Sequence, residues 1–293
     1  MAIIVGEATR LVIQGITGNQ GRFHCARMLE YGSRVVAGTS PGKGGQEVEG
    51  VPVYNTVREA VERHGANASV LFVPARFALD AALEAIDAGI KVLVAITEHI
   101  PVHDAMKLLF RARSRGTVVV GPNTFGVISP GKCKAGIMPG AIYSPGPVGI
   151  VARSGTLSYE IANHLTLAGL GQSTVVGLGG DRVVGLSFVD VLEMMEGDPE
   201  TRAVVLVGEI GGTAEEEAAE YIRTRGRKPA VAYLAGHEAP PGKRMGHAGA
   251  IIERGKGTFA TKVEALRSAG VPVADTPDQV PELVKRALAG GGG

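Results

Sequence analysis

Residues 10–21 read RLVIQGITGNQG, a short apolar run followed at once by three glycines with the spacing GxxGxxG. The apolar run is typical of a strand buried on both faces of a parallel sheet. The glycines let backbone amides approach a phosphate at the turn from strand to helix, and the helix N-terminus favours the negative charge. A dinucleotide is disfavoured, because the spacing is not GxGxxG and no acidic residue follows at the distance that holds a ribose. The stretch predicts an α/β domain with a phosphate-bearing ligand at its first turn.

The same alternation of strand and helix continues along the chain and then begins again. In the first half, strands are predicted at 10–14, 34–37, 69–73, 92–96 and 117–120, with helices at 20–31, 57–64, 75–88 and 103–116. In the second half, strands are predicted at 148–151, 173–176, 203–207, 230–233 and 271–273, with helices at 156–168, 188–196, 214–225, 257–269 and 277–289. This pattern predicts parallel sheets with right-handed crossovers. Residues 121–147 are rich in glycine and proline and predict a linker or long loop. We therefore expect two α/β domains, residues 1–130 and 148–293, joined by a linker at 131–147.

Composition narrows the class of protein. The 293 residues carry 30 basic and 29 acidic side chains, so no general attraction to nucleic acid or to a lipid surface is expected. No leader pattern and no long apolar segment stand in the sequence, which favours a cytoplasmic protein without a membrane span. Two cysteines are too few for a disulfide framework, and we expect no metal on this chain.

The most unusual stretch is GKRMGHAGA at 242–250, where His247 stands among small residues. A neutral imidazole is a competent nucleophile toward phosphoryl groups, and small neighbours leave room for one to approach. Glu209 lies at the carboxyl end of the predicted strand 203–207, beside Gly211 and Gly212, where it could accept a hydrogen bond from one ring nitrogen and leave the other free. The alternatives are a structural or surface histidine and a solvated carboxylate.

Three further motifs could contact an anion. Lys43 lies on the glycine-rich loop 41–45, and residues 96–98 (Ile96, Thr97 and Glu98) follow the fourth strand, at the edge where doubly wound sheets bind ligands. The stretch RSGTLSY at 153–159 opens a second strand-to-helix turn, with an ordinary Ser or Thr cap as the alternative. A solvated lysine and a helix-flanking charge are the alternatives for Lys43 and Glu98. Thr213 and Glu216 fit a capping box.

Together with GPN at 121–123 and GIMPG at 136–140, these motifs resemble the α subunits of succinyl-CoA synthetases over nearly the whole chain. The resemblance implies a Rossmann-like CoA-binding domain followed by a flavodoxin-like ligase domain. His247 would be the phosphorylated histidine, and Glu209 the carboxylate that steadies it. The CoA-binding residues implied by position are Thr17, Gly18, Asn19, Gln20, Lys43, Ile96, Thr97 and Glu98. The substrate and phosphate residues so implied are Ser154, Gly155, Thr156 and Tyr159. Asn19 and the pair Thr124 and Phe125 depart from the residues common in the family.

The resemblance also implies a reversible reaction and a partner. Phosphate displaces CoA from succinyl-CoA, the histidine takes the phosphoryl group from succinyl phosphate, and a nucleoside diphosphate receives it. The sequence lacks GxxxxGK[ST], and the family places ATP or GTP and Mg²⁺ on a β subunit with an ATP-grasp domain. The alternatives are a malate–CoA ligase or NDP-forming acetyl-CoA synthetase, a nicotinamide-dependent oxidoreductase, and a non-catalytic CoA-binding regulator.

Overall fold

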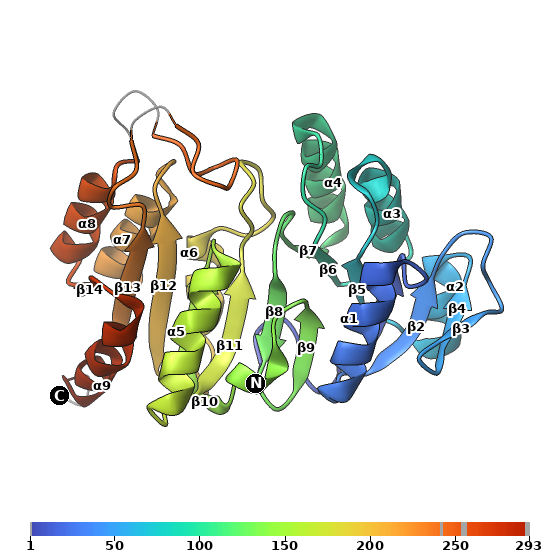
Figure 1. Cartoon of the computed structure of the whole chain (residues 1–293), viewed down its shortest axis with the longest axis horizontal. Helices are drawn as coiled ribbons and strands as arrows, with labels where there is room; N and C mark the ends of the chain where they lie inside the picture. Colours follow the sequence, from blue (N-terminus) through green and yellow to red (C-terminus); the bar gives the residue numbers. More distant parts are fainter. Residues whose placement is uncertain (1, 241–242, 253–256, 291–293) are drawn as a thin grey trace. The chain divides into compact units, whose positions relative to one another are not determined.

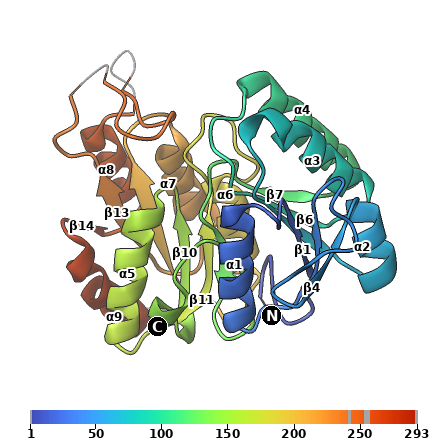
Figure 2. The ribbon, with the colours of Figure 1, turned by 45° about the vertical axis from the view of Figure 1, so that its right-hand side comes forward.

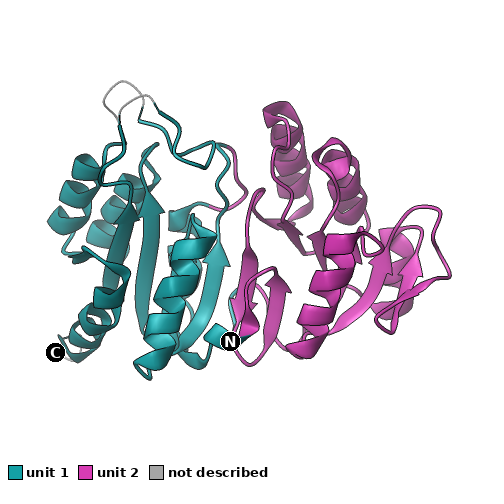
Figure 3. Cartoon of the chain, in the orientation of Figure 1, with its two compact units in different colours: residues 1–3, 141–182, 187–293 teal, residues 4–140, 183–186 magenta. Residues whose placement is uncertain are grey.

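The computed structural model describes residues 2–240, 243–252 and 257–290 (Figure 1). These residues divide into two compact units (Figure 3). The N-terminal unit comprises residues 4–140 and 183–186, and the C-terminal unit comprises the other described residues. The N-terminal unit contains a seven-stranded sheet and a β-hairpin, and the C-terminal unit contains five parallel strands.

The sheet of the N-terminal unit has the strand order β3-β4-β2-β1-β5-β6-β7, and all neighbours are parallel except β3 and β4. Its strands are β1 (Leu11–Gln14), β2 (Val35–Thr39), β3 (Glu47–Val48), β4 (Val51–Tyr54), β5 (Ala68–Leu71), β6 (Val92–Ala95) and β7 (Val118–Val120). Its helices are α1 (Asn19–Glu30), α2 (Val57–His64), α3 (Ala75–Asp87) and α4 (Val102–Arg115). Helix α1 covers one face, and α2, α3 and α4, which contact one another in series, cover the other (Figure 2). Every residue of the central strand β1 is buried, which explains its uninterrupted apolar run.

The glycines of the first turn are required by close packing. Gly15 has a φ of +82°, and a Cβ there would lie 2.5 Å from the carbonyl oxygen of Phe72. A Cβ on Gly21 would lie 2.2 Å from the carbonyl oxygen of Gly15. Any larger residue at Gly21 would therefore push α1 away from the end of β1.

The segment predicted as a linker or long loop contains a β-hairpin. Strands β8 (Gly126–Ser129) and β9 (Cys133–Gly136) pair antiparallel, and a 3₁₀ turn follows at Gly140–Ile142. A Cβ on Gly126 would lie 2.2 Å from the carbonyl oxygen of Ala135, so the strands approach through bare backbone. The glycines that suggested a loop are thus the residues that let the hairpin close. The two short strands β3 and β4 were also not predicted.

The C-terminal unit contains five parallel strands in the order β14-β13-β12-β10-β11. They are β10 (Pro145–Ala152), β11 (Gln172–Gly177), β12 (Ala203–Glu209), β13 (Ala230–Ala235) and β14 (Val273–Ala274). The helices are α5 (Gly155–Leu167), α6 (Phe188–Glu196), α7 (Ala214–Arg225), α8 (Phe259–Ser268) and α9 (Val280–Gly290). Helices α5 and α9 pack together on one face, and α6, α7 and α8 pack in series on the other. Strand β11 follows β10 in the chain and lies on one side of it, and β12 follows β11 but lies on the other side of β10. The topological switch point therefore lies between β10 and β12.

Local signals set several helix ends. The bounds of α2, α6 and α7 agree with the prediction. Capping boxes begin α2, at Thr56 and Glu59, and α6, at Ser187 and Asp190. Helix α8 begins at Phe259 rather than at 257, because the side chain of Thr258 caps it.

The capping box predicted at Thr213 and Glu216 is wrong. The hydroxyl of Thr213 donates to Glu217 at 2.7 Å, and the Glu216 carboxylate instead accepts a hydrogen bond from Lys262 at 2.8 Å. The last predicted helix, 277–289, begins instead with a 3₁₀ turn, Pro277–Gln279, and α9 runs on to Gly290. The rest of the predicted frayed tail, 291–293, lies outside the described residues.

Candidate functional site

The carboxyl ends of β10 and β12 bring two charged residues to the switch point of the C-terminal unit. Glu209 is the last residue of β12, and Arg153 directly follows β10. The Arg153 Nη2 and a Glu209 carboxylate oxygen lie 3.3 Å apart, and both side chains are almost fully buried. Buried charges are stabilised only when they are paired and hydrogen-bonded. The pair therefore fixes the direction of the Glu209 carboxylate.

His247 completes the site by a hydrogen bond to the same carboxylate. Its Nδ1 lies 2.8 Å from Oε2 and 3.0 Å from Oε1 of Glu209. The imidazole is 30% exposed, whereas the carboxylate is 8% exposed. A carboxylate accepts at Nδ1 when that nitrogen carries the proton, which leaves the lone pair of the neutral ring on Nε2. The structure thus brings together the histidine and the glutamate that the sequence analysis paired.

The charges around the ring favour its protonated form. The hydrogen bond to Glu209 is the largest cause that raises the pKa of His247 above its ordinary value. Partial burial opposes this shift, the charges of Glu209 and Asp181 support it, and the charge of Arg153 opposes it. The site therefore stabilises positive charge on the imidazole.

A tight turn presents the ring. The Met245 amide donates to the carbonyl of Ala250 at 2.9 Å, and the Ala250 amide donates to the carbonyl of His247 at 3.1 Å. The Gly249 amide donates to the carbonyl of Gly180 at 3.1 Å. A Cβ on Gly180 would lie 2.5 Å from the imidazole, so the ring packs directly against backbone. The small residues of this motif therefore serve to place the histidine.

Two buried residues that the sequence analysis did not single out hold Arg153 and Glu209 in place. Glu215, in the first turn of α7, accepts hydrogen bonds from the Glu209 amide at 3.1 Å and from Arg153 Nη1 at 3.4 Å. Lys262, on α8, lies 2.5 Å from the other oxygen of Glu215. Both side chains are 0% exposed. The acidic run 215–217 offered a weak signal for Glu215, but nothing in the sequence distinguishes Lys262 from a solvated lysine.

The start of α5 lies directly after Arg153. Gly155 is the first residue of α5, and Ser154 is its N-cap residue but makes no side-chain capping hydrogen bond. The alternative of an ordinary Ser cap at Ser154 is therefore wrong. Ser158 donates to the carbonyl of Gly155 at 2.8 Å. Burial raises the pKa of Tyr159, one residue on, to about 12, so this phenol stays protonated at neutral pH.

In the N-terminal unit the first turn carries a polar cluster. The Thr17 hydroxyl donates to Ser40 Oγ at 2.9 Å and accepts from Lys43 Nζ at 3.2 Å. Gly18, Asn19 and Gln20 are exposed at the start of α1, which has no acidic residue in its first turn. Such a helix start, beside a lysine, attracts an anion.

Two residues that the sequence analysis missed shape this cluster. Ser40 holds the Thr17 hydroxyl, and the Asn55 side chain accepts from the amides of Gly42 and Gly44 at 2.9 and 3.0 Å. Ser40 directly follows β2 and Asn55 directly follows β4, and both are residue types that are common in any turn. The loop that presents Lys43 is therefore fixed by a residue 12 positions further on in the sequence.

Residues 96–98 were predicted to line the CoA site together with this cluster, but among the described residues their side-chain hydrogen bond and ion pair are made elsewhere. Thr97 donates to the carbonyl of Val73 at 2.8 Å, which fixes the backbone after Ile96. Glu98 is 64% exposed and lies 3.6 Å from His99. Within the described residues, no hydrogen bond or ion pair connects Glu98 to Thr17 or Lys43.

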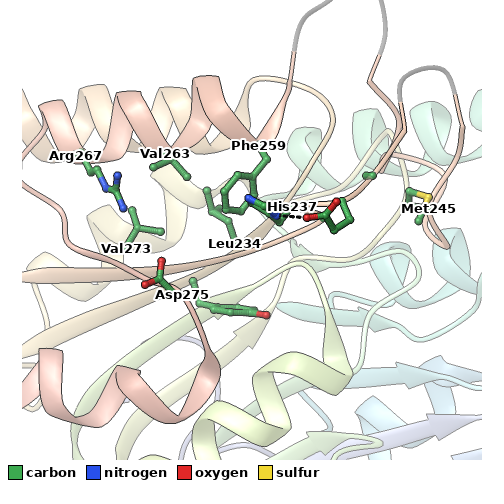
Figure 4. A pocket seen from close by; sticks show the side chains of 12 residues that line it. Leu234, His237, Met245, Phe259, Val263, Arg267, Val273 and Asp275 are labelled. Carbon is green, nitrogen blue, oxygen red and sulfur yellow. Dashed lines mark hydrogen bonds and ion pairs between the residues drawn. The ribbon is translucent and has the colours of Figure 1, made fainter.

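A separate cavity of about 770 Å³ lies between β13, α8 and β14 (Figure 4). Leu234, Val263, Val273 and Phe259 form its apolar part, and His237, Arg267 and Asp275 add polar side chains. Neither His247 nor Glu209 lines it. The predicted chemistry therefore lies outside this cavity. In the described part of the chain, no helix is long and apolar enough to cross a membrane.

Comparisons with known proteins match a different family model to each half of the chain. A family model described as a CoA binding domain matches residues 6–99, and one described as CoA-ligase matches residues 151–272. Succinate–CoA ligase [ADP-forming] subunit alpha 2 of Archaeoglobus fulgidus is 62% identical over 98% of this chain and 100% of its own length. The corresponding α subunit of Aquifex aeolicus is 58% identical over 98% of this chain and 95% of its own length. Among solved structures, ATP citrate lyase from Methanothrix soehngenii, in complex with citrate and coenzyme A, superposes with a TM-score of 0.88 at 26% identity. That match covers 98% of this chain and 50% of the citrate lyase chain.

Proposed function

The chain belongs to the α subunits of succinate–CoA ligases, and we propose that it carries a phosphoryl group on His247 between succinyl phosphate and ADP. The observation that carries the proposal is the buried Glu209 carboxylate at the switch point, hydrogen-bonded to Nδ1 of a histidine that is 30% exposed. The fold of the chain is that of an α/β CoA-binding domain followed by a CoA-ligase domain. We assign residues 1–130 to the first and 148–293 to the second.

The proposed reaction has three reversible steps. A phosphate oxygen attacks the thioester carbon of succinyl-CoA, the C–S bond breaks, and the CoA thiolate leaves. Nε2 of His247 then attacks the phosphorus of succinyl phosphate, the P–O bond breaks, and succinate leaves. A terminal oxygen of ADP finally takes the phosphoryl group from Nε2. ADP rather than GDP is proposed because the relatives are named as ADP-forming.

Glu209 has two tasks in this scheme. Its carboxylate keeps the proton on Nδ1, so that Nε2 is free to attack. It also stabilises the positive charge that the ring gains as the N–P bond forms, which agrees with the raised pKa of His247. The first turn of α5, next to Arg153, would hold phosphate through backbone amides, with Ser154, Gly155 and Thr156 in place. Tyr159 would contact the acid substrate.

CoA is proposed to bind at the N-terminal unit. The exposed start of α1 (Gly18, Asn19 and Gln20) would take its phosphates, and Lys43, held by Thr17, would pair with the nucleotide part. Residues 96–98 would form the neighbouring wall. Support comes from the CoA-binding family match at residues 6–99.

An α subunit acts with a partner chain. We propose that the partner is a β subunit with an ATP-grasp domain, that it binds the nucleotide and Mg²⁺, and that the assembly is cytoplasmic. Mg²⁺ there would neutralise the phosphate oxygens during transfer. Identities of 58–62% to succinate ligases favour succinate over malate or acetate as the acid.

The test is phosphorylation of the chain by labelled ATP in the presence of the β subunit. We expect acid-labile label on wild-type protein, no label on His247→Asn, and CoA affinity within about twofold of wild type in that variant, because separate units carry the two tasks. His164→Asn, a histidine of α5 without an assigned role, is the control and should label normally. Label that persists in His247→Asn would contradict the proposal, as would a comparable loss of CoA binding.

A further inference from the structure

Lys262 is fully buried, although lysine is among the residues that proteins bury least. Its Nζ lies 2.5 Å from Glu215, 2.8 Å from Glu216 and 3.1 Å from the carbonyl oxygen of Gly212. An ammonium group has three donors, and these three acceptors use all of them. The side chain is therefore held in one place.

Glu215 passes this constraint to the residues around His247. One of its oxygens accepts from Lys262, and the other accepts from the Glu209 amide at 3.1 Å and from Arg153 at 3.4 Å. Arg153 in turn contacts the Glu209 carboxylate at 3.3 Å. Both ends of Glu209, its amide and its carboxylate, are thus fixed by groups that depend on Glu215.

We propose that Lys262 is a positioning residue for phosphoryl transfer, which acts through Glu215 to hold the Glu209 carboxylate on Nδ1 of His247. The inference rests on the proposed function. Without the ammonium, Glu215 would be a buried carboxylate with one oxygen unpaired, and it would turn toward another donor. The Glu209 amide and Arg153 would then lose their common acceptor, and the carboxylate would no longer be held against the ring.

The test has two readouts in the full-length chain. The first is the tautomer of His247, measured from its ring ¹⁵N shifts by NMR in the α chain alone. The second is the rate of phosphohistidine formation from ATP with the β subunit. In Lys262→Met we expect a loss of the Nδ1–H preference and a fall in the rate of about ten- to a hundredfold, with an unchanged KM for ATP. Lys262→Arg, which keeps the charge, should restore part of both.

Lys228→Met is the matched control, because Lys228 is a lysine of the same unit that donates to two backbone carbonyls, those of Met195 and Asp198, instead of to Glu215. This variant should lower stability and leave both readouts unchanged. If Lys262→Met does not fold, Lys262→Met with Glu215→Met replaces the pair by apolar residues of similar size, a change that proteins often tolerate. The double variant should show the same two losses.

A folded Lys262 variant that keeps the wild-type tautomer and rate would overturn the inference. Wild-type protein that takes no label from ATP would instead contradict the proposed function. In that case the NMR readout still decides whether Lys262 sets the state of the ring, so the two failures are distinguishable.

Discussion

At the scale of single residues, the pairing of His247 with Glu209 decides how the ring responds to pH. The carboxylate raises the pKa of His247, so the ring stays protonated to a higher pH than an isolated histidine. Attack by Nε2 requires the neutral ring, so phosphohistidine formation should fall as the pH falls through this raised pKa. The carboxylate that stabilises the positively charged ring therefore also reduces the fraction of neutral, reactive histidine at low pH.

Glu209→Gln separates these two effects. Removal of the charge should lower the pKa of His247 toward its ordinary value and move the acid limb of the pH profile to lower pH. The maximum rate should fall about ten- to a hundredfold, because the ring cation loses its carboxylate. The measurement is the rate of phosphohistidine formation against pH, with Glu238→Gln as control, since Glu238 contacts the exposed His237 at 2.7 Å. An acid limb that stays in place would count against the assigned role.

The hydrogen bond between His247 and Glu209 that the sequence suggested is present in the structure, and both residues stand out locally. His247 stands among small residues and Glu209 at the end of a strand, and each position is visible in a short window. Lys262 lies 47 residues from Glu215, on a helix whose pattern does not mark it as buried. Only the packing of α7 against α8 brings the two together.

At the scale of elements, caps decide where several helices begin. The capping box of α2 pairs the Thr56 hydroxyl with the Glu59 amide and the Glu59 carboxylate with the Thr56 amide. Thr213, at the corresponding position of α7, makes no such bond to the backbone. The same residue type therefore has different tasks at two helix starts.

Thr56→Ala should destabilise the N-terminal unit by about 1 kcal/mol, within a range of about 0.5–2 kcal/mol for lost N-caps. Thr213→Ala should lower the free energy of unfolding by less than about 0.5 kcal/mol, because among the described residues the Thr213 hydroxyl bonds to an exposed carboxylate, that of Glu217. Hydrogen exchange of the α2 and α7 amides, together with urea denaturation, measures both. An equal loss of unfolding free energy in the two variants would mean that the capping box does not stabilise α2.

The strands that were not predicted from the sequence, β3, β4, β8 and β9, are short or contain glycine. β3 has two residues and β4 four, lengths at which periodicity is uninformative. In β8 and β9, Gly126 and Gly136 face each other and are required by the narrow gap between the strands. Glycine signals both a turn and a close backbone approach, and sequence alone does not separate the two. The long apolar strands and the helices between them were predicted within a few residues.

At the scale of the whole molecule, the proposal places CoA binding in the N-terminal unit and phosphoryl transfer in the C-terminal unit, so a change that disturbs one unit should leave the other function intact. Gly21→Ala places a Cβ 2.2 Å from the carbonyl oxygen of Gly15 and should shift the start of α1. We expect CoA to bind about tenfold more weakly or worse, a loss of about 1.4 kcal/mol. Phosphorylation from ATP should stay within about twofold of wild type.

Isothermal titration with CoA and labelling with ATP measure the two tasks in one preparation. Gly197→Ala is the control, because Gly197 has an ordinary φ of −77° and the nearest atom to a Cβ there is 3.7 Å away. This variant should match wild type in both assays. If Gly21→Ala abolished phosphorylation as strongly as CoA binding, the division of tasks would be wrong.

The bare backbone beneath the imidazole has a consequence for how such chains lose their activity. Gly180 leaves no space for even a methyl group below the ring. A descendant with alanine there would keep His247 and Glu209 in its sequence, yet its ring would be tilted off the carboxylate. The presence of both reactive residues in a related chain is therefore not enough to count it as a working phosphate carrier, and the residue at position 180 must be read with them.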